Sequence, residues 1–201
     1  MRAIEILDYK SGTISFYQDE DPPNPRTEYD NICTMLCKHP RYILGDRERG
    51  YPEPTHEEVT AIERKRNVIS VRLYLLDHSG LRLSCSAAAM SAYYGGWDTS
   101  WVGIAYVTVG RLRKEFGRAI PQADLRTKAL EILRQEVETY DQYLSGQVYG
   151  YVARNASGDD CGSCWGIFGW NYLTTDMLKE AQAELDTAEA DTQEALSSCP
   201  I

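Results

Sequence analysis

Apolar and polar residues alternate strictly along residues 71–85, where the sequence reads VRLYLLDHSGLRLSC. Apolar side chains recur at every second position on both sides of the tetrapeptide DHSG. A period of two is typical of strands with one buried face, and Asp and Gly favour tight turns. The pattern therefore predicts an antiparallel hairpin, with Asp77 opening its turn and Gly80 in the left-handed conformation.

The same kind of pattern predicts the other elements. Alternation predicts strands over residues 4–9, 13–18, 102–109, 147–154 and 164–168, while residues 32–39 fit either a strand or a helix. Helical periodicity predicts helices over residues 111–116, 123–144 and from about residue 174 onward, and a capping box of Thr55 with Glu58 begins another. Strands in hairpins with late helices predict an α+β fold, a mainly antiparallel sheet with two long helices in the C-terminal half.

The length of the chain favours one folded domain. A chain of 201 residues, 43% of them hydrophobic, can bury a full core and argues against disorder. We therefore predict a single α+β domain over residues 1–201, with residues 174–201 as a possible acidic helical appendage. Tyrosine is frequent, at 14 residues against three phenylalanines, which suits a half-exposed sheet face, a binding surface or ordinary strands.

Negative charge gathers at the C-terminus of the chain. The net charge is −9, and from residue 174 onward seven acidic residues face a single lysine. Direct binding to nucleic acid or to an anionic membrane is disfavoured, because both need a cationic surface. The acidic helix either docks on the basic channel of a nucleic-acid-binding protein or is merely a solvated face. In the first case the predicted partner-binding residues are Glu180, Glu184, Asp191 and Glu194.

Six cysteines raise the question of a metal site. Two groups could together offer soft zinc ligands, namely Cys33, Cys37 and His39 on one side and Cys161 and Cys164 on the other. The spacing of the first group is loose and free cysteines are often buried core residues, so we predict no metal and no cofactor. The N-terminus lacks the pattern of a signal peptide, and no apolar run is long enough for a membrane span. These observations predict an intracellular protein with reduced thiols.

The predicted turn also carries the candidate catalytic groups. A carboxylate, an imidazole and a hydroxyl follow one another there, but neighbouring residues of a turn point in different directions and do not form a triad. His78 could still act as a base or metal ligand with Asp77 and with Asp98 from the segment WDTS. The sequence has no dinucleotide-binding glycine motif, P-loop, H-E-x-x-H or G-x-S-x-G, which lowers the odds of a familiar nucleotide-hydrolysing or hydrolase site.

Five segments up to about residue 169 carry motifs that occur together. They are residues 24–46 (NPRTEYDNICTMLCKHPRYILGD), 73–84 (LYLLDHSGLRLS), 97–108 (WDTSWVGIAYVT), 136–152 (EVETYDQYLSGQVYGYV) and 163–169 (SCWGIFG). With these motifs the chain resembles an uncharacterised family of bacteriophage and prophage proteins. The resemblance implies a phage-encoded accessory protein in the cytoplasm of an infected bacterium, and it brings no established activity. The acidic C-terminal segment lies outside it.

Two classes of function follow from these observations. The first is a protein that binds and inhibits a host defence component, either a CRISPR effector or similar nucleic-acid-binding complex, or its signalling nucleotide. Phage origin, acidic charge and abundant tyrosine favour it. The second is a small metal-dependent hydrolase that uses Asp77, His78 and Asp98. We expect the binding protein rather than the enzyme, with a host protein or nucleoprotein as partner.

Overall fold

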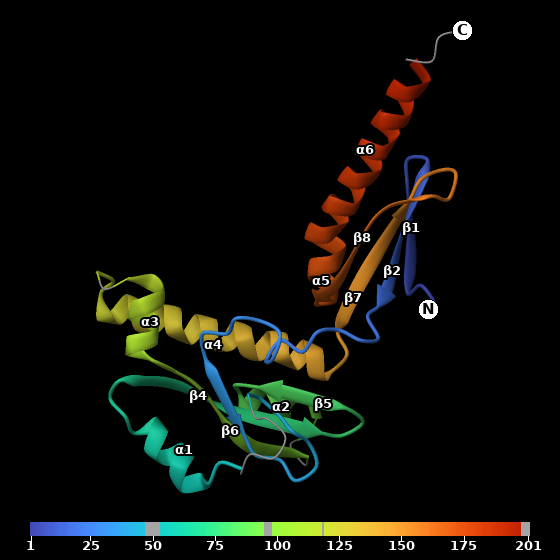
Figure 1. The fold of residues 1–201 in the computed structure, drawn as a ribbon. Coiled ribbons are helices and arrows are strands. Elements are labelled where there is room, and N and C mark those ends of the chain that lie inside the picture. Colours follow the sequence, from blue (N-terminus) through green and yellow to red (C-terminus); the bar gives the residue numbers. More distant parts are fainter. Residues whose placement is uncertain (47–52, 95–97, 118, 198–201) are drawn as a thin grey trace. The chain divides into compact units, whose positions relative to one another are not determined.

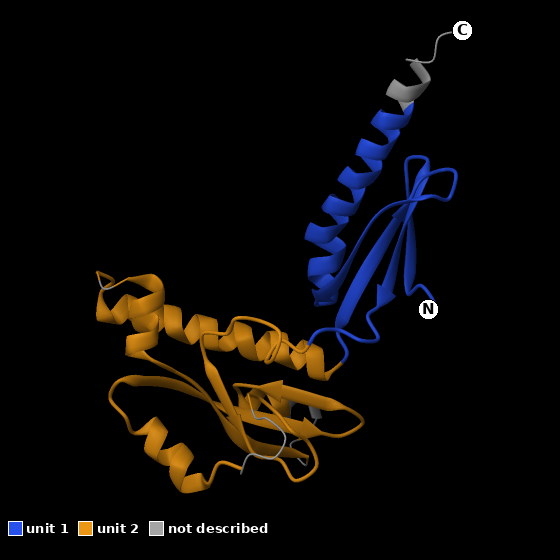
Figure 2. Ribbon diagram, viewed as in Figure 1, with its two compact units in different colours: residues 1–23, 146–201 blue, residues 24–145 orange. Residues whose placement is uncertain are grey.

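The computed structural model describes residues 1–46, 53–94, 98–117 and 119–197, and for residues 91–94 and 193–197 it describes the backbone alone. The chain folds into two units, which Figure 2 shows in blue and orange. Unit 1 joins Met1–Pro23 to Gly146–Ile201, and unit 2 is Asn24–Ser145. The sequence analysis expected one sheet in one domain, whereas each unit contains its own sheet. Whether the two units form a single domain stays a prediction.

Unit 1 is built on a four-stranded antiparallel sheet with the strand order β1-β2-β7-β8 (Figure 1). Its strands are β1 (Glu5–Tyr9), β2 (Gly12–Gln18), β7 (Val148–Arg154) and β8 (Asp160–Phe168). Two hairpins supply them, as the alternation predicted, although β8 begins earlier than expected because register shifts accommodate extra residues. Ile14, Phe16 and Tyr151 are fully buried, since alternate residues of a strand share one face.

Helices of the same unit cover the apolar face of this sheet. The chain runs continuously through α5 (Trp170–Tyr172), the π-helical turn η1 (Leu173–Met177) and α6 (Leu178–Ser197). Leu173 and Ala181 are 0% exposed and Leu185 is 2% exposed, so apolar side chains of η1 and α6 pack on the sheet. This part of the acidic segment therefore belongs to the core of unit 1, because without it the apolar sheet face would be exposed to water. Whether residues 174–201 form an appendage stays a prediction.

Unit 2 contains a second four-stranded antiparallel sheet, with the order β3-β6-β4-β5. Its strands are β3 (Thr34–Cys37), β4 (Val68–Asp77), β5 (Leu81–Ser84) and β6 (Thr99–Thr108). The hairpin predicted over residues 71–85 is β4 with β5, and Asp77 pairs with Leu81 across its turn. Both Ser79, with φ of 55°, and Gly80, with φ of 139°, have positive φ, so the turn differs from the prediction at Ser79.

The long helix α4 (Gln122–Leu144) covers one face of this sheet. Its buried apolar side chains lie at the helical spacing that predicted this helix, at Leu125, Ala129, Leu133, Val137 and Tyr140. The short helix α3 (Val109–Phe116) precedes it and ends at Gly117, as expected from the sequence. Strands in hairpins with two long helices, α4 and α6, confirm the predicted mixed α+β fold.

Two shorter helices complete unit 2. Helix α1 (His56–Glu63) begins with the predicted capping box, in which Thr55 and Glu58 each accept from the other's backbone N–H. It lies on the sheet face opposite α4, where the ring centroids of His56 and Trp101 are 5.2 Å apart. Helix α2 (Ala87–Tyr94) was not predicted, and Met90, which is 6% exposed, anchors it.

Candidate functional site

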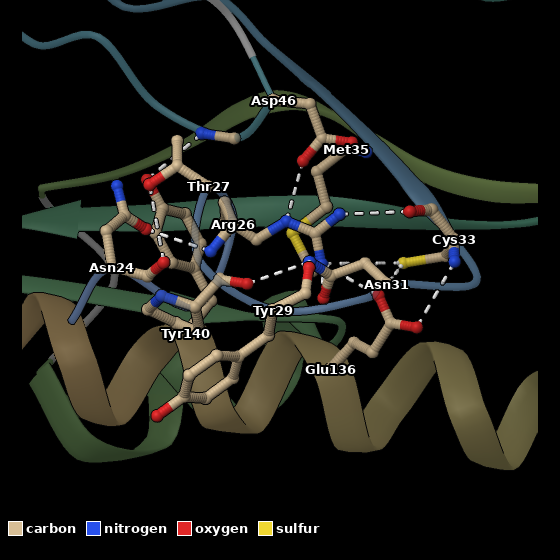
Figure 3. A network of polar contacts seen from close by, with 12 residues as sticks. Asn24, Arg26, Thr27, Tyr29, Asn31, Cys33, Met35, Asp46, Glu136 and Tyr140 are labelled. Carbon is tan, nitrogen blue, oxygen red and sulfur yellow. Dashed lines mark hydrogen bonds and ion pairs between the residues drawn. The ribbon is translucent and has the colours of Figure 1, made fainter. Parts of the chain in front are cut away.

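Arg26 is the centre of a buried polar network in unit 2 (Figure 3). Its side chain is 1% exposed, and its guanidinium is paired with Asp46 at 2.6 Å and with Glu136 at 2.7 Å. The guanidinium also donates to Asn31 Oδ1 at 2.8 Å and to the Cys33 carbonyl oxygen at 2.9 Å. Burial alone would lower the pKa of Arg26, but the hydrogen bonds to the two carboxylates outweigh it and raise that pKa. Each nitrogen of the buried charge therefore has a partner, as its burial requires.

Glu136 supplies the α4 side of this network. Its Oε1 accepts from the backbone N–H groups of Ile32 at 2.8 Å and Cys33 at 3.2 Å. Its Oε2 accepts from the Cys33 thiol at 2.8 Å as well as from Arg26. Burial, and then the Glu136 carboxylate, raises the pKa of the Cys33 thiol, so the thiol is a hydrogen-bond donor at neutral pH and a poor nucleophile. The network is thus a structural tie between the loop before β3 and the middle of α4.

Two further α4 residues make contacts of the same kind. The Tyr140 hydroxyl accepts from the backbone N–H of Gly45 at 3.0 Å, and the Asp141 carboxylate accepts from Arg82 at 2.9 Å. Glu136, Tyr140 and Asp141 belong to one motif segment of the phage resemblance, and their partners belong to two others. These contacts give Glu136, Tyr140 and Asp141 a role in the packing of α4 within unit 2.

A pocket of about 480 Å³ lies against the network. Its volume is within the range of small-molecule sites. The network side of the wall includes Arg26, Cys33 and Asp46, and the rest of the wall includes Asn31, Thr34 and Arg111. The pocket could not be predicted from the sequence, because its walls come from residues 26–46 and 106–111, which are distant in the sequence and meet only in the folded unit.

The predicted catalytic residues do come together at the β4–β5 turn. His78 Nδ1 lies 3.0 Å from Asp98 Oδ2, and the Asp77 backbone N–H donates to the Asp98 carbonyl oxygen at 3.3 Å. The Asp77 carboxylate, however, faces away from His78 toward other partners, because it contacts Arg41 and lies 3.4 Å from His39 Nε2. The three predicted residues are therefore neighbours, but only His78 and Asp98 form a pair.

Two histidines lie at this turn: the exposed His78 within it, and the buried His39, which reaches Asp77 from the segment after β3. The side chain of His78 is 66% exposed, and a carboxylate on Nδ1 is the arrangement that orients a histidine general base. His39 is buried, its Nδ1 accepts from the Arg41 backbone N–H at 3.3 Å, and its Nε2 faces Asp77. His39 therefore fastens the segment after β3 to the turn, a role that the sequence analysis did not foresee.

The two candidate groups of zinc ligands belong to different units. Cys33, Cys37 and His39 lie in unit 2, whereas Cys161 and Cys164 lie in unit 1. Burial raises the pKa of Cys37 to about 12, which keeps that thiol protonated and so disfavours metal binding. Within the described residues, no three His, Cys, Asp or Glu side chains are grouped closely enough to hold one metal ion.

The four acidic residues predicted to bind a partner have different surroundings. Glu180 and Asp191 are exposed on α6, whereas the side chain of Glu194 lies outside the described residues. Glu184 turns toward the sheet, where its carboxylate covers Gly162 and its Oε2 is buried. Burial, and then the neighbouring Glu184 carboxylate, raises the pKa of Tyr151. The predicted acidic stripe is thus interrupted at Glu184.

Other α6 acids hold the helix on its own sheet. Asp186 pairs with Lys10 of the β1–β2 turn at 2.6 Å, and Glu189 contacts Lys10 at 3.7 Å and also Ser11. Two of the charges that made this helix look like a binding surface are therefore used within unit 1.

The other face of the sheet of unit 1, which α6 does not cover, has exposed apolar side chains. Ile4 is 52% exposed, Ile6 is 60% exposed and Trp165 is 40% exposed. Ile6 pairs with Ser15 on the side opposite the buried Ile14 and Phe16 positions. Trp165 lies over Gly150, which leaves room for the indole because glycine lacks a side chain. The ring centroids of Trp165 and Tyr17 are 5.9 Å apart. We call this surface the open sheet face.

Comparison with protein-family models, curated proteins and solved structures finds no match for this chain. Among the described helices, none combines the length and the apolar character that crossing a membrane would require.

Proposed function

We propose that the chain is a binding protein that docks through the open sheet face of unit 1 onto a host protein and inhibits it. The observation that carries this proposal is the exposure of Ile6 and Trp165 on this sheet face, with the exposed Ile4 directly before β1. Exposed apolar side chains that gather on one face of a protein mark interaction sites. Tryptophan and tyrosine, present here as Trp165 with Tyr17, are residues that dominate the affinity of protein interfaces.

The charge of the chain supports a partner with a cationic surface. The net charge is −9, and Glu180 and Asp191 remain exposed after the internal pairs of α6 are made. Such a field accelerates association with a basic protein, while apolar contact supplies the affinity. With the phage resemblance, this favours a nucleic-acid-binding component of host defence, such as a CRISPR effector, in the cytoplasm of the infected bacterium.

Capture of the partner with a matched pair of variants tests this proposal. The chain is used as bait in the lysate of a bacterium with an active defence system, and the captured protein is identified, purified and assayed with and without the chain. Ile6→Asp should weaken binding by about tenfold or more, because it places a charge in the apolar contact. Ile43→Asp is the control, since Ile43 is an exposed isoleucine, 46% exposed, in unit 2.

The outcomes separate the proposal from simple stickiness. Binding and inhibition that are lost in Ile6→Asp and kept in Ile43→Asp support it. Equal binding by Ile6→Asp and the wild type, or capture of a protein whose activity is unchanged by the chain, overturns it. Both substitutions are at exposed positions and should leave the fold intact.

An enzyme is the second candidate, favoured by the His78–Asp98 pair. The contact of 3.0 Å leaves His78 Nε2 available as a general base, although among the described residues no group of side chains that could hold a metal ion surrounds it. A hydrolase of this kind would activate water with His78 alone. Hydrolysis of chromogenic phosphodiesters or esters that is lost in His78→Gln and kept in His56→Gln would support it. Absence of turnover, or equal turnover in both variants, would remove this candidate.

A further inference from the structure

The pocket beside the Arg26 network contains one arginine whose charge is not neutralised. Arg111, in the first turn of α3, donates from Nη2 to the Asn31 carbonyl oxygen at 3.2 Å, and no ion pair to it is present in the described part of the chain. Arg26 differs, because Asp46 and Glu136 both pair with it and its side chain is 1% exposed. Arg111 is therefore the cationic group in this pocket that a ligand could use.

The other lining groups describe what kind of molecule would fit. Thr34 and Thr108 bring hydroxyl groups, and Tyr106 pairs with Thr34 across β3 and β6. Asp30 also lines the pocket, so a ligand whose negative charge is spread over several anionic groups would be repelled there. A pocket of about 480 Å³ is large enough for a molecule of metabolite size.

We propose that this pocket binds a small polar molecule with a single anionic group, a phosphate monoester or a carboxylate, held by Arg111. Arginine presents its N–H groups in a planar fork that matches both kinds of anion. Asp30 and the threonine hydroxyls would hydrogen-bond to hydroxyl or amino groups of the same ligand. This site goes beyond the proposed docking function, because it lies in unit 2 and uses none of the open sheet face.

Binding of simple probes to the full-length chain tests the site. The probes are glycerol phosphate, glycine as a carboxylate with a nearby amino group, and tripolyphosphate as a polyanion. Binding is followed by calorimetry and by amide chemical shifts of residues 29–34 and 106–111. Glycerol phosphate or glycine should bind more tightly than tripolyphosphate, and the preferred one identifies the anionic group.

Two arginine variants on the same helix provide the decisive comparison. Arg111→Gln should weaken the preferred probe by about tenfold or more, which corresponds to the loss of a charge-assisted hydrogen bond. Arg113→Gln removes the same charge from α3 outside the pocket and should bind like the wild type. Amide spectra of both variants, outside the pocket, should match the wild type and show that the fold is kept.

Each result supports or overturns the proposal. Loss in Arg111→Gln with retention in Arg113→Gln supports it. No binding of any probe, equal loss in both variants, or tripolyphosphate as the tightest probe overturns it, since the last two would indicate unspecific attraction to a basic helix. The Ile6→Asp variant should bind the probe normally, so failure of the docking function would not be mistaken for failure of this site.

Discussion

Gly80 and Ser79 show how single residues shape the turn that carries His78. Both have positive φ, a conformation that is unfavourable for a residue other than glycine, so the backbone is strained at Ser79. A side chain at Gly80 would meet no neighbouring atom, so any penalty for replacing it comes from the backbone alone. The geometry of the turn thus depends on conformational preference rather than on packing.

Gly80→Val should therefore lower the free energy of unfolding by roughly 1–3 kcal/mol, because a β-branched residue is strained at a φ of 139°. Chemical denaturation followed by circular dichroism measures the change. Ser79→Gly is the control and should be close to neutral, since glycine relieves the strain but makes the unfolded chain more flexible. An unchanged midpoint for Gly80→Val would mean that the turn has another conformation.

The buried Cys37 should make the stability of the protein sensitive to alkaline pH. Burial raises its pKa from 9.0 to about 12, so the folded chain holds this proton more tightly than the unfolded chain does. The resulting contribution to stability is complete below pH 9 and is lost as the pH rises toward 12. Cys37→Ala should flatten this part of the pH profile of the unfolding free energy. A wild-type profile that is already flat between these limits would contradict the assignment.

At the scale of elements, α4 organises unit 2 through polar as well as apolar contacts. Its apolar stripe packs on the sheet, while Glu136, Tyr140 and Asp141 each reach a different segment of the same unit. Buried polar groups that are fully partnered fix one arrangement of the chain, because any slip would leave a donor or acceptor without a partner. Helix α4 therefore specifies where the loop before β3 and the strand β5 must lie.

Removing one partner of the buried ion pair should be costly. Glu136→Gln should reduce the unfolding free energy by about 3–5 kcal/mol, since it leaves Arg26 buried with one carboxylate fewer. A double-mutant cycle then combines Arg26→Met with Glu136→Met. The double variant should be less destabilised than the sum of the single variants Arg26→Met and Glu136→Met, because no uncompensated charge remains. Urea denaturation of the four proteins gives the coupling energy. Strictly additive effects would show that the two side chains do not interact.

Elements were predictable from the sequence to the extent that their signals are local. Alternation gave the β1–β2 and β4–β5 hairpins, and the 3.6-residue period gave α4 within one residue at its start. Helix α2 was missed because its small residues have hardly any amphipathic pattern. The short strand β3 stayed ambiguous because its direction is fixed by pairing with β6, which is a distant contact.

For the whole molecule, the site was predictable only where neighbours in space are neighbours in sequence. His78 was found because it lies in a recognisable turn, but its partner Asp98 could only be guessed. The Arg26 network joins residues that are far apart in the sequence, whereas hydrophobic periodicity reports only on neighbouring positions. The orientation of Glu184 toward the sheet depends on Gly162, which leaves space for its carboxylate. Division into two units was also hidden, because unit 1 is assembled from both ends of the chain.

The charges of α6 differ in what they can contribute to binding. Asp186 and Glu189 contact Lys10 of the β1–β2 turn, and Glu184 faces the sheet. Glu180 and Asp191, by contrast, are exposed on the described part of α6. Charges outside an interface act mainly on the rate of association, through their long-range field, and salt screens them. A partner with a basic surface would be attracted by these two residues without requiring them in the final contact.

Glu180→Lys combined with Asp191→Lys should therefore reduce the association rate constant with the captured partner by about tenfold at low salt, with little change in the dissociation rate. Surface plasmon resonance at two ionic strengths measures both rates, and the difference between the variant and the wild type should shrink as salt rises. Glu184→Gln is the matched control: it removes an acid from the same helix, but its buried carboxylate faces the sheet, so the association rate should stay unchanged. The fold should survive the double reversal because exposed charges contribute little to stability. An equal change of the association rate constant in Glu184→Gln and in the double variant would point to a general effect of charge rather than to steering by an exposed surface. An association rate that changes with neither salt nor charge reversal would leave the apolar side chains of the open sheet face as the sole determinants of binding.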